Sequence, residues 1–214
     1  MHLLSPDDLH CYDTVRRCDL PKGTRLLHSK MDLKTKYTTV GEFLKHKARL
    51  VCLGNLEAPD PTRDLFSPTV NNKTINLMFA LAAQQGLKLR GLDIYGAFIT
   101  ADIEADSPVY MQLPPGLLPD VDNEPPIWKL RKTLYGLRRS PKAFYDDLSS
   151  YLMEYGYVRS ANDRCLFHKR LADGRHIMFC IHVDDFAVAA TDDALIDQLC
   201  IDLKNKYIVK ESDT

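Results

Sequence analysis

The chain has 214 residues, 45% of them hydrophobic, and a formal net charge of −1. These values predict one domain of two lobes, or two small domains, with a substantial core. They argue against a generic nucleic-acid binder, which would carry a large positive charge. No apolar run approaches the ~20 residues of a membrane span, and no signal peptide opens the chain. Six scattered cysteines without Cys-x-x-Cys spacing favour a reducing intracellular compartment and argue against a zinc site.

Charged residues are segregated into blocks along the chain. Residues 91–127 contain seven acidic residues and no basic ones, and residues 184–202 contain six acidic residues and no basic ones. Residues 128–145 contain six basic residues and no acidic ones, and residues 1–50 carry a net charge of +4. A metal site beside a polyanion track needs both signs in separate patches, although ordinary surface charge can cluster in the same way.

One clear strand precedes the first helix. Residues 1–44 are weakly patterned, and the basic, interrupted stretch 30–36 is not assigned to a helix or a strand. Residues 47–54 alternate basic with apolar residues and then become apolar, which predicts a strand ended by Gly54. Residues 55–71 contain three prolines and little periodicity, which is typical of a loop.

Three later segments repeat apolar residues at helical spacing. They are residues 72–85, 140–155 and 191–203. A glycine follows each of the first two helices and stops it. The expected N-cap residues, in the same order, are Asn72, Ser140 and Thr191.

Short alternating or wholly apolar runs predict strands between and after these helices. They cover residues 87–94, 109–113, 127–131, 165–170, 176–182, 186–190 and 207–210. From Leu87 onward the order is strand, inserted segments, helix, strands, helix, strand, as in a split βαβ, ferredoxin-like fold. We therefore expect an α+β fold in which helices cover one face of an antiparallel sheet.

The stretch from His176 to Ala190 holds two adjacent carboxylates, Asp184 and Asp185, between two apolar runs. The simplest geometry is a tight hairpin with both carboxylates near its tip. Ionised carboxylates in such surroundings are costly unless a positive group compensates, and a divalent cation is suited to that role. The chain's other three Asp-Asp pairs lie in polar surroundings. Solvated turn aspartates are the simpler alternative.

Asp93, near the end of the strand 87–94, completes a set of three carboxylates. With this set the chain resembles the reverse transcriptase of copia-type LTR retrotransposons. The resemblance covers residues 45–214 and rests on motifs that follow in the family's order. They are Lys47-Ala48-Arg49-Leu50-Val51 of the fingers strand, Phe66-Ser67-Pro68, Asp93-Ile94-Tyr95-Gly96-Ala97-Phe98 of motif A, residues 109–116, residues 134–145 of motif B, and His182-Val183-Asp184-Asp185 of motif C.

Four features differ from the family's pattern. His182 stands where motif C usually begins with Tyr, and Tyr95 stands where a Lys or another polar residue is usual. Residues 54–57 replace the usual Gly-Tyr-Thr-Gln, and residues 24–44 lack the strand expected there. No thumb, RNase H or integrase sequence is present, so we expect these regions to belong to a longer polyprotein.

The resemblance implies a polymerase palm built on the ferredoxin-like core, with partial fingers, in residues 45–214. The palm core would comprise residues 72–98 and 127–214. The implied reaction is nucleotidyl transfer, in which a primer 3′-hydroxyl attacks the α-phosphate of a dNTP. By this resemblance two Mg²⁺ ions, with Mn²⁺ as an alternative, would be held by Asp93, Asp184 and, as the weaker third ligand, Asp185.

The resemblance also implies roles for other residues. Lys47 and Arg49 would reach the dNTP triphosphate, and Phe98 would exclude the 2′-hydroxyl of a ribonucleotide. Tyr135 and Gly136 would lie beside the incoming nucleotide. The alternatives are a solvated strand face for the first pair and core packing for Phe98. The expected nucleic-acid contacts, for which a solvated basic patch is the alternative, are Arg138, Arg139, Lys142 and His182.

The implied partners are an RNA or DNA template with its primer, and dNTP, with no membrane. The implied location is intracellular and mainly cytoplasmic, in a virus-like particle, with the nucleus left open. Two alternatives stand beside the polymerase hypothesis. A retrotransposon-derived fragment could bind nucleic acid or a partner without polymerising. A ferredoxin-like binding module with coincidental acids would show no Mg²⁺ dependence and no clustering of Asp93 with Asp184.

Overall fold

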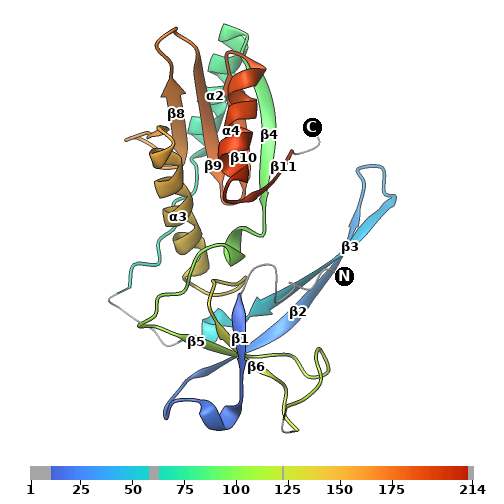
Figure 1. Cartoon of the computed structure of the whole chain (residues 1–214). Coiled ribbons are helices and arrows are strands. Elements are labelled where there is room, and N and C mark those ends of the chain that lie inside the picture. Colours follow the sequence, from blue (N-terminus) through green and yellow to red (C-terminus); the bar gives the residue numbers. More distant parts are fainter. Residues whose placement is uncertain (1–10, 58–62, 122, 212–214) are drawn as a thin grey trace. The chain divides into compact units, whose positions relative to one another are not determined.

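The computed structural model describes residues 11–57, 63–121 and 123–211 (Figure 1). The chain divides into two compact units. The five-stranded unit comprises residues 1–65 and 98–143, and the six-stranded unit comprises residues 66–97 and 144–214. Within the described ranges, no helix is long and apolar enough to cross a membrane.

The six-stranded unit is built on one sheet with the strand order β11-β4-β10-β9-β8-β7, in which all neighbours are antiparallel (Figure 1). The strands are β4 (Lys88–Tyr95), β7 (Val158–Arg159), β8 (Leu166–Arg170), β9 (His176–His182), β10 (Asp185–Ala190) and β11 (Ile208–Glu211). The helices are α2 (Asn72–Gln85), α3 (Ser140–Glu154) and α4 (Asp193–Lys204). The first turn of α3 belongs to the five-stranded unit.

Strand β10 lies between β4 and β9 and is antiparallel to both, so β4 and β9 run parallel to each other. Helix α3 lies between β4 and β9 in the sequence, and α4 connects β10 to β11. This is the strand order of a split βαβ arrangement, with β8 and β7 added at one edge. As a result, the end of β4 that carries Asp93 lies beside the β9–β10 turn.

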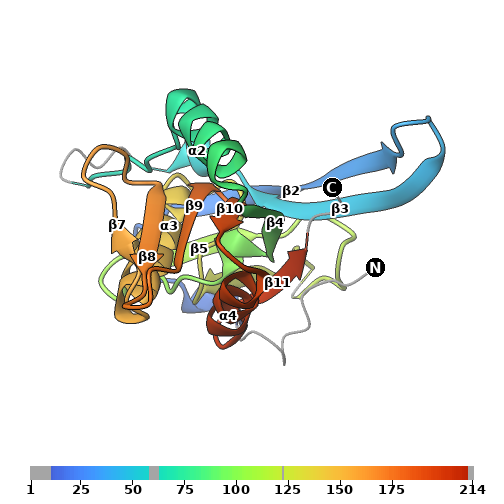
Figure 2. The same cartoon turned by 90° about the horizontal axis from the view of Figure 1, so that it is seen from above.

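Helices pack on both faces of this sheet. Phe179 and Cys180 are consecutive in β9 and therefore point to opposite faces. Cys180 lies in a buried cluster with Met78 of α2. The Phe179 ring contacts that of Tyr157 at 5.4 Å between centroids, and the Tyr157 hydroxyl donates to the buried Asp202 of α4 at 3.0 Å. Helix α2 therefore covers one face, and α3 and α4 lie on the other (Figure 2).

The expectation that all helices cover one face was therefore wrong for α2. The physical reason lies in β10, whose residues 186–190 are apolar at every position. Phe186 and Val188 fill one face of the strand, while Ala187 and Ala189 pack against the α2 side. A strand that is apolar on both faces must be covered on both.

The structure also corrects the first expected N-cap. Helix α2 is capped by Asn71 and not Asn72, because the Asn71 side chain accepts the N–H of Lys73 at 2.9 Å. At the start of α3 the buried Ser140 hydroxyl donates to the carbonyl of Leu134 at 2.7 Å. Adjacent polar residues at the start of a helix can each serve as the N-cap. The sequence therefore predicts where a helix lies more accurately than it predicts which residue begins it.

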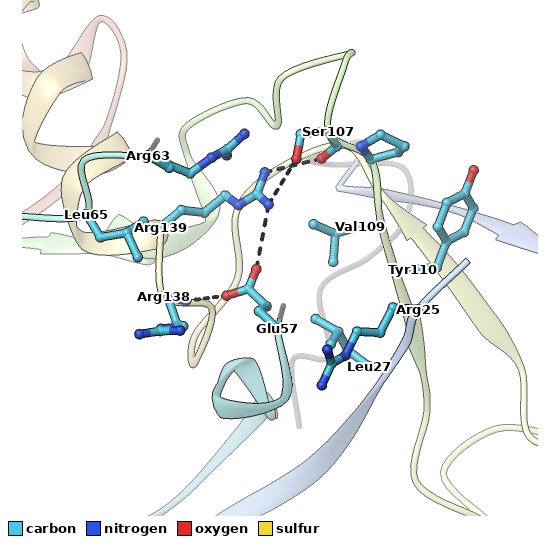
Figure 3. Close-up of a pocket in the computed structure, with 11 residues that line it drawn as sticks. Arg25, Leu27, Glu57, Arg63, Leu65, Ser107, Val109, Tyr110, Arg138 and Arg139 are labelled. Carbon is cyan, nitrogen blue, oxygen red and sulfur yellow. Dashed lines mark hydrogen bonds and ion pairs between the residues drawn. The ribbon is translucent and has the colours of Figure 1, made fainter. Parts of the chain in front are cut away.

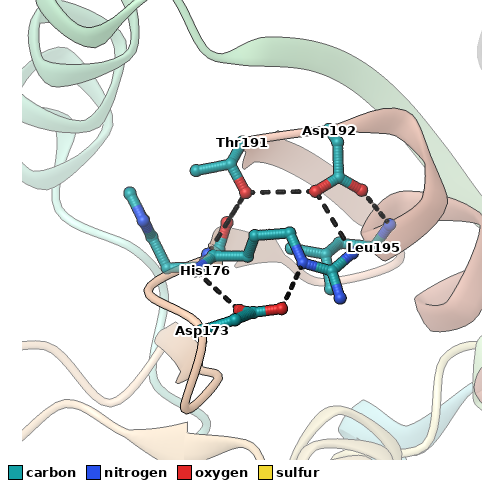
Figure 4. Close-up of polar contacts among 6 residues, drawn as sticks. Asp173, His176, Thr191, Asp192 and Leu195 are labelled. Atoms are coloured by element: carbon teal, nitrogen blue, oxygen red, sulfur yellow. Dashed lines mark hydrogen bonds and ion pairs between the residues drawn. The ribbon is translucent and has the colours of Figure 1, made fainter.

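Helix α4 is capped by Asp192 and not by Thr191. The Asp192 carboxylate accepts the N–H of Leu195 at 3.1 Å (Figure 4). The Thr191 hydroxyl instead accepts the N–H of His176 at 3.2 Å and lies 3.3 Å from the Asp192 carboxylate. Thr191 thus ties the end of β10 to the start of β9.

The five-stranded unit has the strand order β1-β6-β5-β2-β3. Its strands are β1 (Tyr12–Val15), β2 (Leu26–Tyr37), β3 (Phe43–Cys52), β5 (Val109–Gln112) and β6 (Ile127–Leu130). Short 3-10 turns follow β1, β3 and β4 at η1 (Arg17–Asp19), η2 (Gly54–Leu56) and η3 (Ala97–Ile99). Cys52, Met111, Trp128 and Leu134 lie in its buried core, so the core is formed where the short strands meet the bases of β2 and β3.

Strand β2 corrects the expectation that residues 24–44 lack the family's strand, because a strand forms there without the family's usual sequence. It pairs with β3 from Ser29–Cys52 to Tyr37–Phe43 and forms a long ribbon that extends from the sheet (Figures 1 and 2). The signal was present, because residues 30–36 alternate charged residues with Met31, Leu33 and Thr35. Most of this stretch is solvent-exposed, so it lacks the apolar content by which buried strands are recognised.

The β2–β3 ribbon, residues 30–37 and 43–51, has two chemically different faces. Cross-strand partners share a face, and the register therefore gathers most of the bases on one side. They are Lys30, Lys34, Lys36, Lys45, Lys47 and Arg49, with Asp32 as the only acid. The opposite face carries Leu33 and Tyr37, which are 71% and 62% exposed. The register thus concentrates positive charge on one face of the ribbon.

Candidate active site

The acidic hairpin turns through two residues. His182 pairs with Asp185, so Val183 and Asp184 form a two-residue turn between β9 and β10. Val183 has a φ of 62°, a left-handed value that β-branched residues rarely adopt. Such a conformation costs about 1–3 kcal/mol and persists only where the surroundings hold it, often at functional sites. The turn that carries Asp184 is therefore strained.

Asp93 lies directly opposite Asp185 in the register of β4 and β10. The Ile94 N–H donates to the Asp184 carbonyl at 2.9 Å, which identifies the Asp93–Asp185 pair as a non-hydrogen-bonded one. Cα atoms in such pairs are about 4.5 Å apart and both side chains share one face. Residues 92 positions apart thus put two carboxylates side by side, with Asp184 in the adjoining turn.

These two acids are the centre of a row across four strands. His182 of β9 pairs with Asp185, and Lys210 of β11 pairs with Asp93 on its other side. The Lys210 ammonium lies over the Tyr95 ring, 4.3 Å from its centroid. Like charges directly opposite each other on neighbouring strands are destabilising. Asp93 and Asp185 therefore repel each other, while Lys210 supplies a positive charge beside Asp93.

The donor chemistry of this site suits a hard divalent cation. Asp93 and Asp184 are half-buried and Asp185 is exposed, so their oxygens are accessible to a ligand. Among the described residues, no three His, Cys, Asp or Glu side chains are gathered closely enough to hold a metal ion. Mg²⁺ does not require such a cage, because it keeps its own waters and takes one or two carboxylates together with substrate phosphates.

Three of the residues expected beside the nucleotide form one cluster in the five-stranded unit. The Arg49 guanidinium lies over the Tyr135 ring at 5.2 Å. Tyr135 in turn meets the edge of the half-buried Phe98 ring at 5.2 Å between centroids. Lys47 lies two residues from Arg49 on the same face of the ribbon. The three acids belong to the six-stranded unit, and this cluster belongs to the other.

The backbone of Gly136 lies close to that of Cys52 in β3, whereas the resemblance implied a close approach to the nucleotide. It has a φ of +92°, and a Cβ built on it would lie 2.0 Å from the Cys52 carbonyl oxygen. The Cys52 N–H donates to the Tyr135 carbonyl at 2.8 Å. A Cβ on Gly54 would likewise lie 2.3 Å from the Gly136 oxygen. The glycines thus let the segment before α3 cross the end of β3, which positions Tyr135.

The basic residues expected at the template differ in how much they are engaged with the protein. Arg139 donates to the carbonyl and hydroxyl of Ser107 at 3.2 Å each and lies 3.7 Å from the Glu57 carboxylate (Figure 3). Lys142 forms an ion pair with Asp64 at 3.6 Å. The Arg138 N–H donates to Glu57 at 3.0 Å while its side chain is exposed.

Glu57 is the residue that sequence reasoning missed. Its side chain is only 13% exposed, and it accepts from the Arg138 backbone and faces the Arg139 guanidinium. It belongs to residues 54–57, which depart from the family's pattern. Burial, followed by the nearby Arg63 charge, lowers the pKa of Arg139. The sequence signal that pointed to Glu57 was an acidic residue at a place where the chain differs from the family's pattern.

Comparison with known proteins identifies the family. The profile described as reverse transcriptase (RNA-dependent DNA polymerase) matches residues 12–213. The retrovirus-related Pol polyprotein from transposon TNT 1-94 of Nicotiana tabacum is 31% identical over 199 residues, covering 92% of this chain and 15% of the relative. That from transposon RE1 of Arabidopsis thaliana is 33% identical over 193 residues, covering 89% of this chain and 13% of the relative.

The chain thus spans about one seventh of the length of these curated relatives. The structure of telomerase from Candida albicans, in complex with a fragment of telomeric RNA, covers 95% of this chain and 45% of its own with 10% identity. Its TM-score is 0.39, which is too low to support an argument about fold or function. The profile match and the relatives confirm the resemblance that the motifs suggested, and the chain belongs to the reverse transcriptase family.

Proposed function

We propose that this chain is the RNA-directed DNA polymerase domain of a copia-type retrotransposon Pol polyprotein. The proposed reaction adds a dNTP to the 3′-hydroxyl of a primer held on an RNA or DNA template. The observation that carries the proposal is that Asp93 faces Asp185 across β4 and β10, beside the strained turn with Asp184. Family membership supplies the reaction class, and the carboxylates supply the chemistry.

Asp93, Asp184 and Asp185 would hold the Mg²⁺ ions, with Mn²⁺ as an alternative. When bound, such ions stabilise the attacking and the leaving oxygens of the displaced phosphate. The protein's own contribution is to hold the carboxylates: β4 and β10 fix Asp93 and Asp185 on one face, and the two-residue turn fixes Asp184. His182 lies at the edge of this row, where it would contact nucleic acid.

We assign the six-stranded unit to the palm and the five-stranded unit to the fingers. The cationic face of the β2–β3 ribbon supports this assignment, since Lys47 and Arg49 lie on it and would reach the triphosphate. The Arg49–Tyr135–Phe98 contacts support a role for these side chains at the nucleotide. Arg138 has the exposed guanidinium best suited to a template phosphate.

Primer extension tests the proposal directly. The purified chain, given an RNA template, a DNA primer and dNTPs, is expected to extend the primer with Mg²⁺ and to stop when EDTA removes the metal. Mn²⁺ is expected to substitute in part. Protein that binds the template–primer but extends nothing with either metal would contradict the polymerase proposal and favour the non-polymerising fragment.

Phe98→Ala is expected to relax sugar selection. Removing the ring leaves room for a 2′-hydroxyl while the carboxylates stay in place, so the preference for dNTP over NTP should fall on the order of tenfold or more. The measurement is kcat/KM for each nucleotide in single-nucleotide extension. Phe98→Tyr keeps the ring and serves as the control. An unchanged ratio in an active Phe98→Ala enzyme would assign Phe98 to core packing.

A further inference from the structure

The five-stranded unit contains a cavity of about 250 Å³ that is dominated by arginine side chains (Figure 3). Four arginines and a single carboxylate line it, together with apolar side chains. The charged residues are Arg25, Arg63, Arg138, Arg139 and Glu57. Only Arg138 and Arg139 were expected from the sequence to meet a ligand. Such a concentration of guanidinium groups in one concave site suggests an anion.

The carboxylate that lines the cavity, Glu57, already interacts with groups of the protein. Glu57 accepts the Arg138 N–H and faces the Arg139 guanidinium, which Ser107 also holds. Arg63 forms an ion pair with Glu104 at 2.8 Å. Arg25 and Arg138 have exposed side chains, and neither forms an ion pair within the described part of the chain. Two guanidinium groups thus remain to meet an outside anion.

We propose that this cavity is a phosphate-binding subsite for the sugar–phosphate backbone of a nucleic acid. Arg25 and Arg138 would contact the phosphate, since guanidinium groups bind its oxygens with paired hydrogen bonds. Arg139 and Glu57 would hold the wall in position. This inference rests on the proposed function, because the anion is the nucleic acid that the polymerase would hold.

The size and lining of the cavity favour a backbone phosphate over a free nucleotide. Pockets that enclose a whole small ligand usually measure about 300–1,000 Å³, and this one is smaller. Leu27 and Val109 give it apolar walls suited to a sugar. A phosphate with part of its sugar would fill it. Contacts of this kind fix the register of a strand and carry no base information.

The test compares two double variants of equal charge. Arg25→Gln/Arg138→Gln removes the proposed phosphate-binding groups. Arg164→Gln/Arg170→Gln removes two exposed arginines from the six-stranded unit and is the matched control. Binding of a labelled RNA–DNA template–primer is followed by fluorescence anisotropy over a range of KCl concentrations. The cavity variant should bind at least about tenfold more weakly at low salt. Its log–log salt slope should fall by about 0.7–0.9 for each phosphate that the variant no longer neutralises.

A third variant keeps the test decisive if the glutamines disturb folding. Arg25→Lys/Arg138→Lys keeps the charge but loses the paired hydrogen bonds, so it should keep most of the salt slope and lose part of the affinity. Inorganic pyrophosphate and an unlabelled oligonucleotide are then compared as competitors at equal phosphate concentration. Displacement by the oligonucleotide alone supports a backbone site. Equal displacement by pyrophosphate, absent in the cavity variant, would overturn that assignment in favour of a free phosphate ligand.

The outcomes separate this inference from the polymerase proposal. If the cavity variant binds more weakly than the wild-type chain as expected, but the wild-type chain extends no primer, the subsite is supported and the polymerase proposal is contradicted. A cavity variant that binds like the Arg164→Gln/Arg170→Gln control, with the same affinity and salt slope, would overturn the subsite whatever the extension assay shows.

Discussion

Asp93→Asn and Asp184→Asn are each expected to reduce primer extension by about three orders of magnitude or more. A neutral amide is a far poorer ligand for a hard cation than a carboxylate, and metal stabilisation of the transferring phosphate supplies several kcal/mol, each ~1.4 kcal/mol being a tenfold change in rate. Asp185→Asn should have a smaller effect, because Asp185 is exposed and is the weaker ligand by resemblance. Single-turnover extension at saturating Mg²⁺ measures these losses.

The stability of the folded state should be affected far less than the activity. Asp93→Asn removes the repulsion from Asp185 across β10 and also the attraction of Lys210 across β11, so the free energy of unfolding should change by no more than about 1 kcal/mol. Asp120→Asn, at an exposed position in the five-stranded unit, is the control for removing one charge. An inactive Asp93→Asn protein that also melts earlier would point to a structural role for Asp93.

Gly136→Ala is expected to lower the free energy of unfolding by at least about 4 kcal/mol or to prevent folding. Its Cβ would lie 2.0 Å from the Cys52 carbonyl oxygen, which belongs to the same peptide unit as the Leu53 N–H, and that N–H donates to the His28 carbonyl at 2.8 Å. Losses of this size come from a few mechanisms, of which overpacking against backbone is one. Trp128 is the only tryptophan and lies in the core of this unit, so its fluorescence reports unfolding in urea.

Gly116→Ala provides the matched comparison. Gly116 lies in the same unit with a φ of +76°, but a Cβ there would meet nothing within 4 Å. The free energy of unfolding of Gly116→Ala should fall by only about 1–2 kcal/mol, the cost of placing an alanine in the left-handed conformation. The difference between the two variants isolates the backbone crossing. Equal losses would mean that the Cys52 contact relaxes and that Gly136 matters only for its φ.

The sequence was sufficient to place the elements around the acids. Apolar periodicity located α2, α3, α4 and most strands of the six-stranded sheet, and the order of the elements put Asp93 near the β9–β10 turn. Prediction from the sequence failed for a strand that is largely exposed and for a side chain whose contacts lie far away in the chain. Strand β2 is largely exposed, and Arg139 depends on Glu57 and Ser107, which lie far away in the chain. Such contacts are set by tertiary packing and leave no local periodicity.

Val183 also makes the acidic hairpin stiff. A β-branched side chain restricts χ1, and the left-handed backbone of Val183 persists only because the paired strands on either side of the turn hold it there. A glycine would relieve the strain but would let the turn sample several backbone wells. The stiff turn limits the motion of Asp184, so its carboxylate has little conformational entropy to lose when it captures a ligand. The hairpin is therefore strained in the free protein, but its carboxylate is already ordered before a ligand binds.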